Sequence, residues 1–246
     1  MSCPSSQLNT AESLTAVESA LLFGHRLKRL DTPLLIETAL VTIAAILAIR
    51  LLAVSSISND AWFVNPGILV AAALIPTAIK RGKFAEMGFS VKQIGPTLLI
   101  LCRICVIIFS VLFVGLWLLK SCRLALPLRP VPPQGQGWVS WLLYQFMYVA
   151  VAEEVFFRGY VQTNILRLTN TSKRGQGRLW KWISIAGSAA CFSVAHIIVQ
   201  GDVVLVLTFL PGLILGWLFI RTRSLLAPIL FHGLANACYC LMAALI

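Results

Sequence analysis

Charged side chains are scarce in this sequence, since Asp, Glu, Lys and Arg together make up only 12% of its 246 residues. An ordinary soluble domain carries about 25% charged residues. Hydrophobic residues make up 59% of the chain, and its mean hydropathy is +0.87. This composition excludes most water-soluble folds. Together with apolar runs of about 20 residues, it predicts an all-α, polytopic helical membrane protein.

Acidic residues are rarer still, with nine Asp and Glu against 20 Lys and Arg and a net charge of +11. Such an excess can indicate nucleic-acid binding, but the basic residues lie between apolar runs, where they set membrane orientation. We therefore expect the lipid bilayer as a partner and no nucleic acid. A disulfide framework is also lacking, because the seven cysteines are scattered through apolar segments in the manner of small packing residues.

Seven apolar runs, each bounded by charge, Pro or Gly, predict transmembrane helices. They lie at 34–54, 63–79, 97–119, 138–160, 182–199, 203–220 and 225–245. Six or eight spans stay open, because the second and sixth runs are short or contain Pro76 and Pro211. The chain divides into an amphipathic surface segment (1–33), amino-terminal membrane helices with a Pro-rich loop (34–137) and a carboxyl-terminal membrane region (138–246).

The distribution of Lys and Arg among the connecting segments predicts the orientation in the membrane. If the amino terminus is cytoplasmic, most basic residues fall on that side, and only Lys120, Arg123 and Arg129 fall on the other. Cytoplasmic loops carry an excess of Lys and Arg. We therefore expect a cytoplasmic amino terminus, and the plasma (inner) membrane if the source is bacterial.

Two carboxyls, Glu153 and Glu154, stand side by side inside the fourth apolar run. A charge at membrane depth costs about 2.5–3.5 kcal/mol on insertion scales, so such residues usually face a wet cavity or a partner. Glu154 and Arg158 have the i, i+4 spacing of an ion pair. We assign Glu154 to Arg158, which leaves Glu153 to face a substrate. The alternative is that the ion pair only holds helices together.

Two of the three histidines, His196 and His232, also lie inside apolar runs, each on a different span. Phe192 precedes His196 by four residues and Asn236 follows His232 by four, so the members of each pair share a helix face. A single intramembrane histidine is more often a packed, hydrogen-bonded residue than a catalyst. Carboxyls, imidazoles and an amide on three spans of one half of the chain nevertheless predict a joint site.

The depths of these residues present a difficulty for that prediction. With the span limits above, Glu153 lies nearer the cytoplasmic face and His196 nearer the outer face. At about 1.5 Å per residue, they meet only if helix boundaries shift by several residues or a helix is kinked. Gly187, Gly201 and Gly212 would permit such irregularity.

Three motifs, in order and each within its own predicted span, resemble those of the CPBP family. They are Glu153-Glu154-x-x-x-Arg158, Phe192-x-x-x-His196 and His232-x-x-x-Asn236. This family, formerly called Abi, contains type II CAAX prenyl endopeptidases and bacteriocin-processing or self-immunity proteins. The resemblance covers 138–246, which it marks as a catalytic region, and it implies an intramembrane protease.

The resemblance also implies a role for each matching residue. Glu153 is the residue that activates the hydrolytic water, and His196 helps to position it. His232 and Asn236 hold the oxyanion. The supporting residues are those that order the helix and the cavity, namely Glu154, Arg158 and Phe192.

The residues themselves allow the mechanism to be argued independently. Peptide hydrolysis requires a base for water and donors for the oxygen that gains charge, and a carboxyl in an apolar cavity is a stronger base than one in water. The chain has no His-Glu-x-x-His helix. We therefore favour a glutamic mechanism with no metal or other cofactor. Two histidines and a glutamate on separate spans keep a zinc site as the alternative.

The family implies a peptide or protein substrate at the membrane. Candidates are prenylated carboxyl-terminal peptides, precursors such as bacteriocins, and carboxyl-terminal sorting tails of exported proteins. Two other functions stay open. One is a non-catalytic immunity or scaffold protein, and the other is a transporter that relays protons through the intramembrane acids and imidazoles.

Overall fold

The computed structural model describes residues 31–55, 64–80, 84–89, 94–123, 137–168 and 177–245. Every regular element within these ranges is helical, and no strand occurs in them. The predicted all-α polytopic fold is confirmed. Nearly all of the predicted surface segment (1–33) and of the Pro-rich loop lies outside the described residues.

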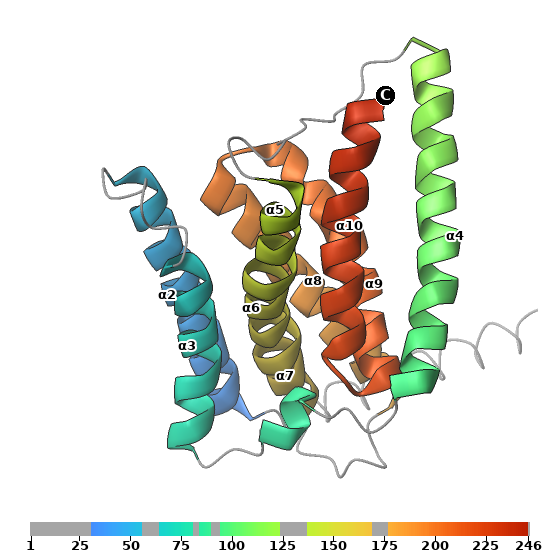
Figure 1. Cartoon of the computed structure of the whole chain (residues 1–246). Helices are drawn as coiled ribbons and strands as arrows, with labels where there is room; N and C mark the ends of the chain where they lie inside the picture. The colour runs from blue at the N-terminus through green and yellow to red at the C-terminus, as the bar shows by residue number, and fades with distance from the viewer. Residues whose placement is uncertain are drawn as a thin grey trace, which may run out of the picture.

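The described chain passes along the bundle seven times, in alternating directions (Figure 1). The passes are α2 (Thr32–Val54), α3 (Val64–Ile79), α4 (Ile94–Ser121), a helix over 138–167, α8 (Arg178–Gln200), η6 (Val203–Thr208) with α9 (Phe209–Thr222), and α10 (Leu226–Leu245). Among these, α2, α4, α8 and the η6–α9 pass are long and apolar enough to cross a membrane, and α3 and α10 contain shorter apolar helices. The chain is an integral membrane protein whose passes correspond to the seven predicted runs.

The helix over 138–167, which we call the central helix, carries both adjacent glutamates. It consists of α5 (Trp138–Tyr144), η4 (Gln145–Ala150), α6 (Val151–Glu154), η5 (Val155–Gln162) and α7 (Thr163–Arg167), of which η4 and η5 are π-helical. Such wide turns are rare and often occur at functional sites. Glu153 and Glu154 lie in the short α-helical segment between them.

The central helix extends seven residues beyond its predicted end at residue 160. Thr163 and Asn164 in this extension are polar but buried. The amide of Asn164 donates to the hydroxyl of Thr38 on α2 at 3.2 Å, which satisfies part of its hydrogen-bonding capacity. The helix therefore continues past the end of the apolar run because a neighbouring helix supplies a polar partner.

In Figure 1 the central helix lies between the α2–α3 pair and α10, and α4 stands at the edge of the bundle beside α10. One hydrophobic core joins α2, α3, the central helix and α8, and a second joins α4, α9 and α10. The rings of Phe109 and Phe231 stack at 5.6 Å in the second core. Gly212 lets α9 approach α8 closely, because a Cβ there would lie 3.1 Å from the Cβ of Ala189.

Capping residues mark the start of α2 and the turn between α8 and η6. Asp31 caps α2 by accepting a hydrogen bond from the amide of Leu34 at 3.1 Å. Gly201 ends α8 at φ +71°, a left-handed conformation that glycine adopts without steric cost. Asp202 follows and caps η6 through the amide of Val204 at 2.9 Å.

The end of the bundle at the bottom of Figure 1, which we call the basic end, is closed by η3 (Phe84–Met87). Met87 is 1% exposed and packs against Gly159 of the central helix. Glu86 pairs with Arg167 at 2.9 Å, and the carbonyl of Gly88 accepts from the amide of Leu225 at 2.9 Å. These contacts connect a segment between α3 and α4 to the carboxyl-terminal helices.

Candidate active site

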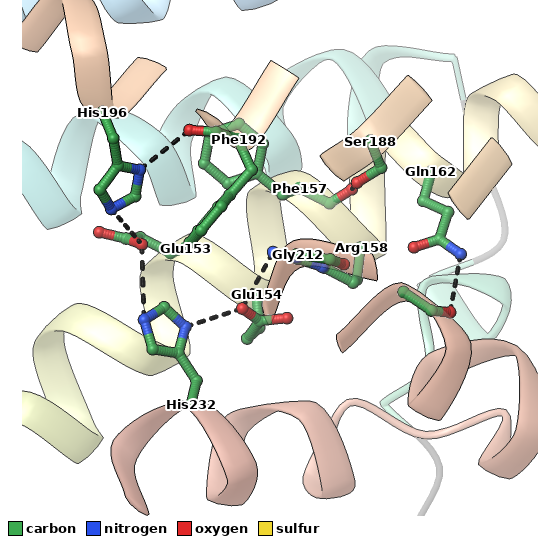
Figure 2. A network of polar contacts seen from close by, with 11 residues as sticks. Glu153, Glu154, Phe157, Arg158, Gln162, Ser188, Phe192, His196, Gly212 and His232 are labelled. Carbon is green, nitrogen blue, oxygen red and sulfur yellow. Dashed lines mark hydrogen bonds and ion pairs between the residues drawn. The ribbon is translucent and has the colours of Figure 1, made fainter. Parts of the chain in front are cut away.

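Three side chains from three helices meet at the centre of the bundle, as Figure 2 shows. Glu153 projects from the central helix, His196 from α8 and His232 from α10. The Nε2 atoms of His196 and His232 lie 3.9 and 3.8 Å from Glu153 Oε2. The structure therefore brings together the carboxyl and the two imidazoles that were predicted to form a joint site.

The predicted difference in depth between Glu153 and His196 is not observed. The prediction ended the span at residue 160, only seven residues beyond Glu153, whereas the central helix continues to Arg167. Glu153 is consequently near the middle of its helix. His196 lies four residues from the end of α8, and the left-handed Gly201 ends that helix directly after the pocket-lining Gln200.

The second carboxyl makes the ion pair predicted from its spacing. Glu154 Oε1 lies 3.0 Å from Arg158 Nη1, and both side chains are fully buried. Arg158 Nη2 donates to the carbonyl of Gly212 on α9 at 3.1 Å. His232 Nδ1 lies 2.8 Å from the same Glu154 oxygen. Glu154 thus joins Arg158 to the histidine that faces Glu153.

Phe192 packs at the centre of these groups. The Arg158 guanidinium lies 4.7 Å from its ring centroid, which is a cation–π contact. The rings of His196 and His232 lie 4.3 and 5.8 Å away. Its main-chain carbonyl is 2.9 Å from His196 Nδ1. The four-residue spacing of Phe192 and His196 therefore gives both a ring contact and a backbone hydrogen bond.

Asn236 is placed differently from the other predicted residues. It lies one helical turn from His232 on α10, but its amide nitrogen donates to Gln145 Oε1 at 2.9 Å. Gln145 begins the π-helical stretch η4 and was not singled out from the sequence. The sequence does contain a signal for Gln145, because it is a polar residue within an apolar run. It lies eight residues, or about two helical turns, before Glu153, so the two side chains lie on similar parts of the helix surface.

A pocket of about 170 Å³ reaches the site from the end of the bundle opposite the basic end. Glu153 and His196 line it together with Asn65 of α3, Tyr148 of the central helix and Gln200 of α8. Asn65 was missed because all three motifs lie within 138–246 and none lies in the first 137 residues. Its Oδ1 atom is buried and accepts no hydrogen bond from any described residue.

Arg50 on α2 lies close to this pocket, one residue beyond the pocket-lining Ile49. Its guanidinium donates to the carbonyl of Val199 at 3.2 Å, near the carboxyl end of α8. The main-chain carbonyls at a helix end lack intrahelical partners, and a cation stabilises them. Arg50 therefore has a structural partner at the wall of the pocket.

The ligand chemistry at Glu153, His196 and His232 bears on the zinc alternative. Tetrahedral zinc ligands lie about 3.3 Å apart, given metal–ligand distances of about 2.0–2.2 Å. The two Glu153–histidine separations are 3.9 and 3.8 Å. Within the described ranges, no group of three or more His, Cys, Asp or Glu side chains is arranged to hold a metal ion.

Residues 135–238 match the family model described as Type II CAAX prenyl endopeptidase Rce1-like. The match covers less than half of the chain and supports a relation of this region to the CAAX protease family. The matched CAAX protease region contains all seven motif residues, from Glu153 to Asn236, whereas the pocket wall formed by α2 and α3 lies outside the match. The comparisons with curated proteins and with solved structures found no match.

The match supports a CAAX-type intramembrane endopeptidase in general terms, with a peptide or protein as its substrate at the membrane. The resemblance inferred from the three motifs is thereby confirmed.

Proposed function

We propose that this protein is an intramembrane endopeptidase in which Glu153 is the general base that activates water. The observation that carries the proposal is the position of the Glu153 carboxyl, which lines a pocket and faces two imidazole nitrogens at 3.9 and 3.8 Å. These distances are too long for direct hydrogen bonds but can be bridged by one water. The family supports peptide hydrolysis as the reaction.

The hydrogen bonds of His196 indicate how it orients the water. A carbonyl oxygen only accepts, so the contact between Phe192 O and His196 Nδ1 requires a proton on Nδ1. In neutral His196, Nε2 is therefore an acceptor directed at Glu153. A water between them donates one O–H to each, and its lone pair is left to attack a substrate carbonyl. His196 acts as a positioning residue in this arrangement.

His232 is proposed to stabilise the oxyanion as an imidazolium. Its Nδ1 donates to Glu154, which is already paired with Arg158. The buried cluster of two carboxylates and one guanidinium carries one net negative charge, which a protonated His232 neutralises. Uncompensated buried charge is costly, so this state is favoured. The imidazolium Nε2–H then donates to the oxygen that becomes negative.

The proposed reaction balances without a cofactor. Glu153 takes one proton from water as the water oxygen bonds to the peptide carbonyl carbon, and the carbonyl oxygen becomes the oxyanion. The oxyanion then collapses, the C–N bond breaks, and the proton held by Glu153 passes to the leaving nitrogen. Asn236 has a second N–H beyond the one given to Gln145, and we propose that it donates to the oxyanion as well.

Glu153→Gln tests the proposal, because glutamine keeps the shape of the side chain but is not a base. Removal of a general base lowers hydrolysis by about 100-fold or more. Peptidomics should detect cleavage products in membranes that contain the unaltered protein. We expect these products to be absent from membranes that contain Glu153→Gln. Glu37→Gln is the matched control, since Glu37 pairs with Lys80 away from the pocket.

The same variants separate the alternative functions. Peptidomes that do not differ between the unaltered protein and a folded Glu153→Gln variant would reject the protease. A scaffold tolerates this substitution and fails only when its docking face is altered. A proton relay shows dependence on an ion gradient, which neither a scaffold nor a hydrolase requires.

A further inference from the structure

We propose that the peptide reaches Glu153 from the end of the bundle opposite the basic end, and that this end faces the non-cytoplasmic side. The substrate is then a segment of an exported or membrane-anchored polypeptide, cleaved from the outer side of the bilayer. This inference rests on the proposed function and specifies its substrate class. Three independent features of the fold support it.

The first feature is the position of the pocket. From α2 it is lined by Ile46 and Ile49, close to the carboxyl end of that helix, and from α3 by Asn65, at its amino end. From α8 it is lined by residues between Ala195 and Gln200, the last residue of that helix. These helix ends all lie away from the basic end (Figure 1).

The second feature is the closure of the path from the basic end. Residues 154–164, which follow Glu153 toward that end, are all buried. Arg158 is bonded to Gly212, and the amide of Gln162 donates to the carbonyl of Gly216 at 3.0 Å (Figure 2). Below them, η3 covers the central helix through Met87. A peptide entering there would have to break this packing and these hydrogen bonds.

The third feature is the charge at the two ends. At the basic end, the helix ends and the segments that join them contain 14 of the 20 Lys and Arg: three before α2, four between α3 and α4, five around the connection to α8 and two between α9 and α10. The opposite connections contain three. An excess of this size places the basic end in the cytoplasm.

The pocket lining indicates what kind of segment fits. Its walls carry apolar and aromatic side chains, including Ile49, Leu69 and Tyr148, which favour similar side chains beside the scissile bond. The buried Oδ1 of Asn65 accepts no hydrogen bond within the described residues, so it can accept one from a peptide N–H. An extended apolar stretch near a membrane anchor meets both requirements.

The direction of entry can be measured with single cysteines in a chain whose native cysteines are replaced by alanine. Gln200 and Arg178 are the two ends of α8, and both are exposed. We expect a membrane-impermeant maleimide to label Gln200→Cys and Asn65→Cys in intact cells. Arg178→Cys should react only after permeabilisation. The reverse pattern overturns the inference.

Cleavage is measured with one candidate segment presented on either side of the membrane. Two reporters carry the same apolar tail, taken from the peptidome, in an exported and in a cytoplasmic form. We expect the unaltered protein to cut only the exported form. Cutting of the cytoplasmic form alone overturns the inference. If neither form is cut and the labelling is as expected, the entry side stands and the protease proposal fails.

Discussion

Replacing Arg158 with methionine removes the guanidinium that pairs with Glu154, while a long side chain remains in the same space. Arg158 is fully buried, and its guanidinium contacts Glu154, the Gly212 carbonyl and the ring of Phe192. The variant leaves Glu154 with His232 as its remaining partner among the described contacts. It also leaves the Gly212 carbonyl without this donor. We expect a large loss of stability from these changes.

The magnitude follows from the burial of both charges. Removing one partner of a fully buried ion pair costs about 3–5 kcal/mol, because the other charge is left uncompensated. For a chain of about 150–250 residues, each kcal/mol shifts Tm by about 2–4 °C. Arg158→Met should therefore lower Tm by about 6–20 °C. Methionine fills most of the space, so cavity formation contributes little to this loss.

Thermal unfolding in detergent micelles measures the effect, and two further variants identify its cause. In the double variant Glu154→Gln/Arg158→Met the buried site loses both charges, and at least half of the lost Tm should return. Arg103→Met is the control, since Arg103 lies exposed on α4, and its Tm should change by less than about 2 °C. A double variant as unstable as Arg158→Met would refute the argument from uncompensated charge.

Three further predictions follow from individual contacts. Asn236→Ala and Gln145→Ala should each lower kcat more than they raise KM. The kcat of the double variant should equal that of Asn236→Ala, because Gln145 acts through Asn236. Additive losses of kcat would show that the two residues act independently. Gly233→Ala should lower the free energy of unfolding by about 1–3 kcal/mol, because the added Cβ would overlap the Phe146 ring. Adding Phe146→Ala to this variant should raise Tm again. A Tm unchanged by Gly233→Ala alone would contradict this packing. Elemental analysis of active, chelator-treated protein should find no stoichiometric zinc, and one tightly bound equivalent would support the metal mechanism instead.

Sequence periodicity was sufficient to predict contacts between residues of the same helix. Glu154 and Arg158 are four residues apart on one helix, and so are Phe192 and His196, and both pairs form the contacts that this spacing predicts. Seven apolar runs likewise predicted the seven passes, since membrane helices must satisfy their own backbone hydrogen bonds. Local rules of this kind act within one element and do not require knowledge of its neighbours.

Relations between helices were less predictable. The end of the central helix was misjudged because Asn164 pairs with a hydroxyl on α2, which hydropathy does not register. Asn65 and Gln145 are single polar residues that match no motif, and only the packing of α3 and α10 against the central helix brings them near the site. The closure of the basic end by Met87 and Glu86 depends on the path of a short segment between two spans.

The two π-helical stretches determine how the central helix would respond to a one-residue deletion. Each contains i to i+5 bonding, so that removing one residue would convert it toward an ordinary α-helix. Because a π-turn holds about one residue more than an α-turn, such a deletion in η4 would leave the helix beyond it in nearly the same phase relative to α5. A chain one residue shorter in 145–150 could therefore still present Glu153 to the pocket, whereas an equal deletion in the α-helical segment 151–154 has no wide turn of its own to absorb it.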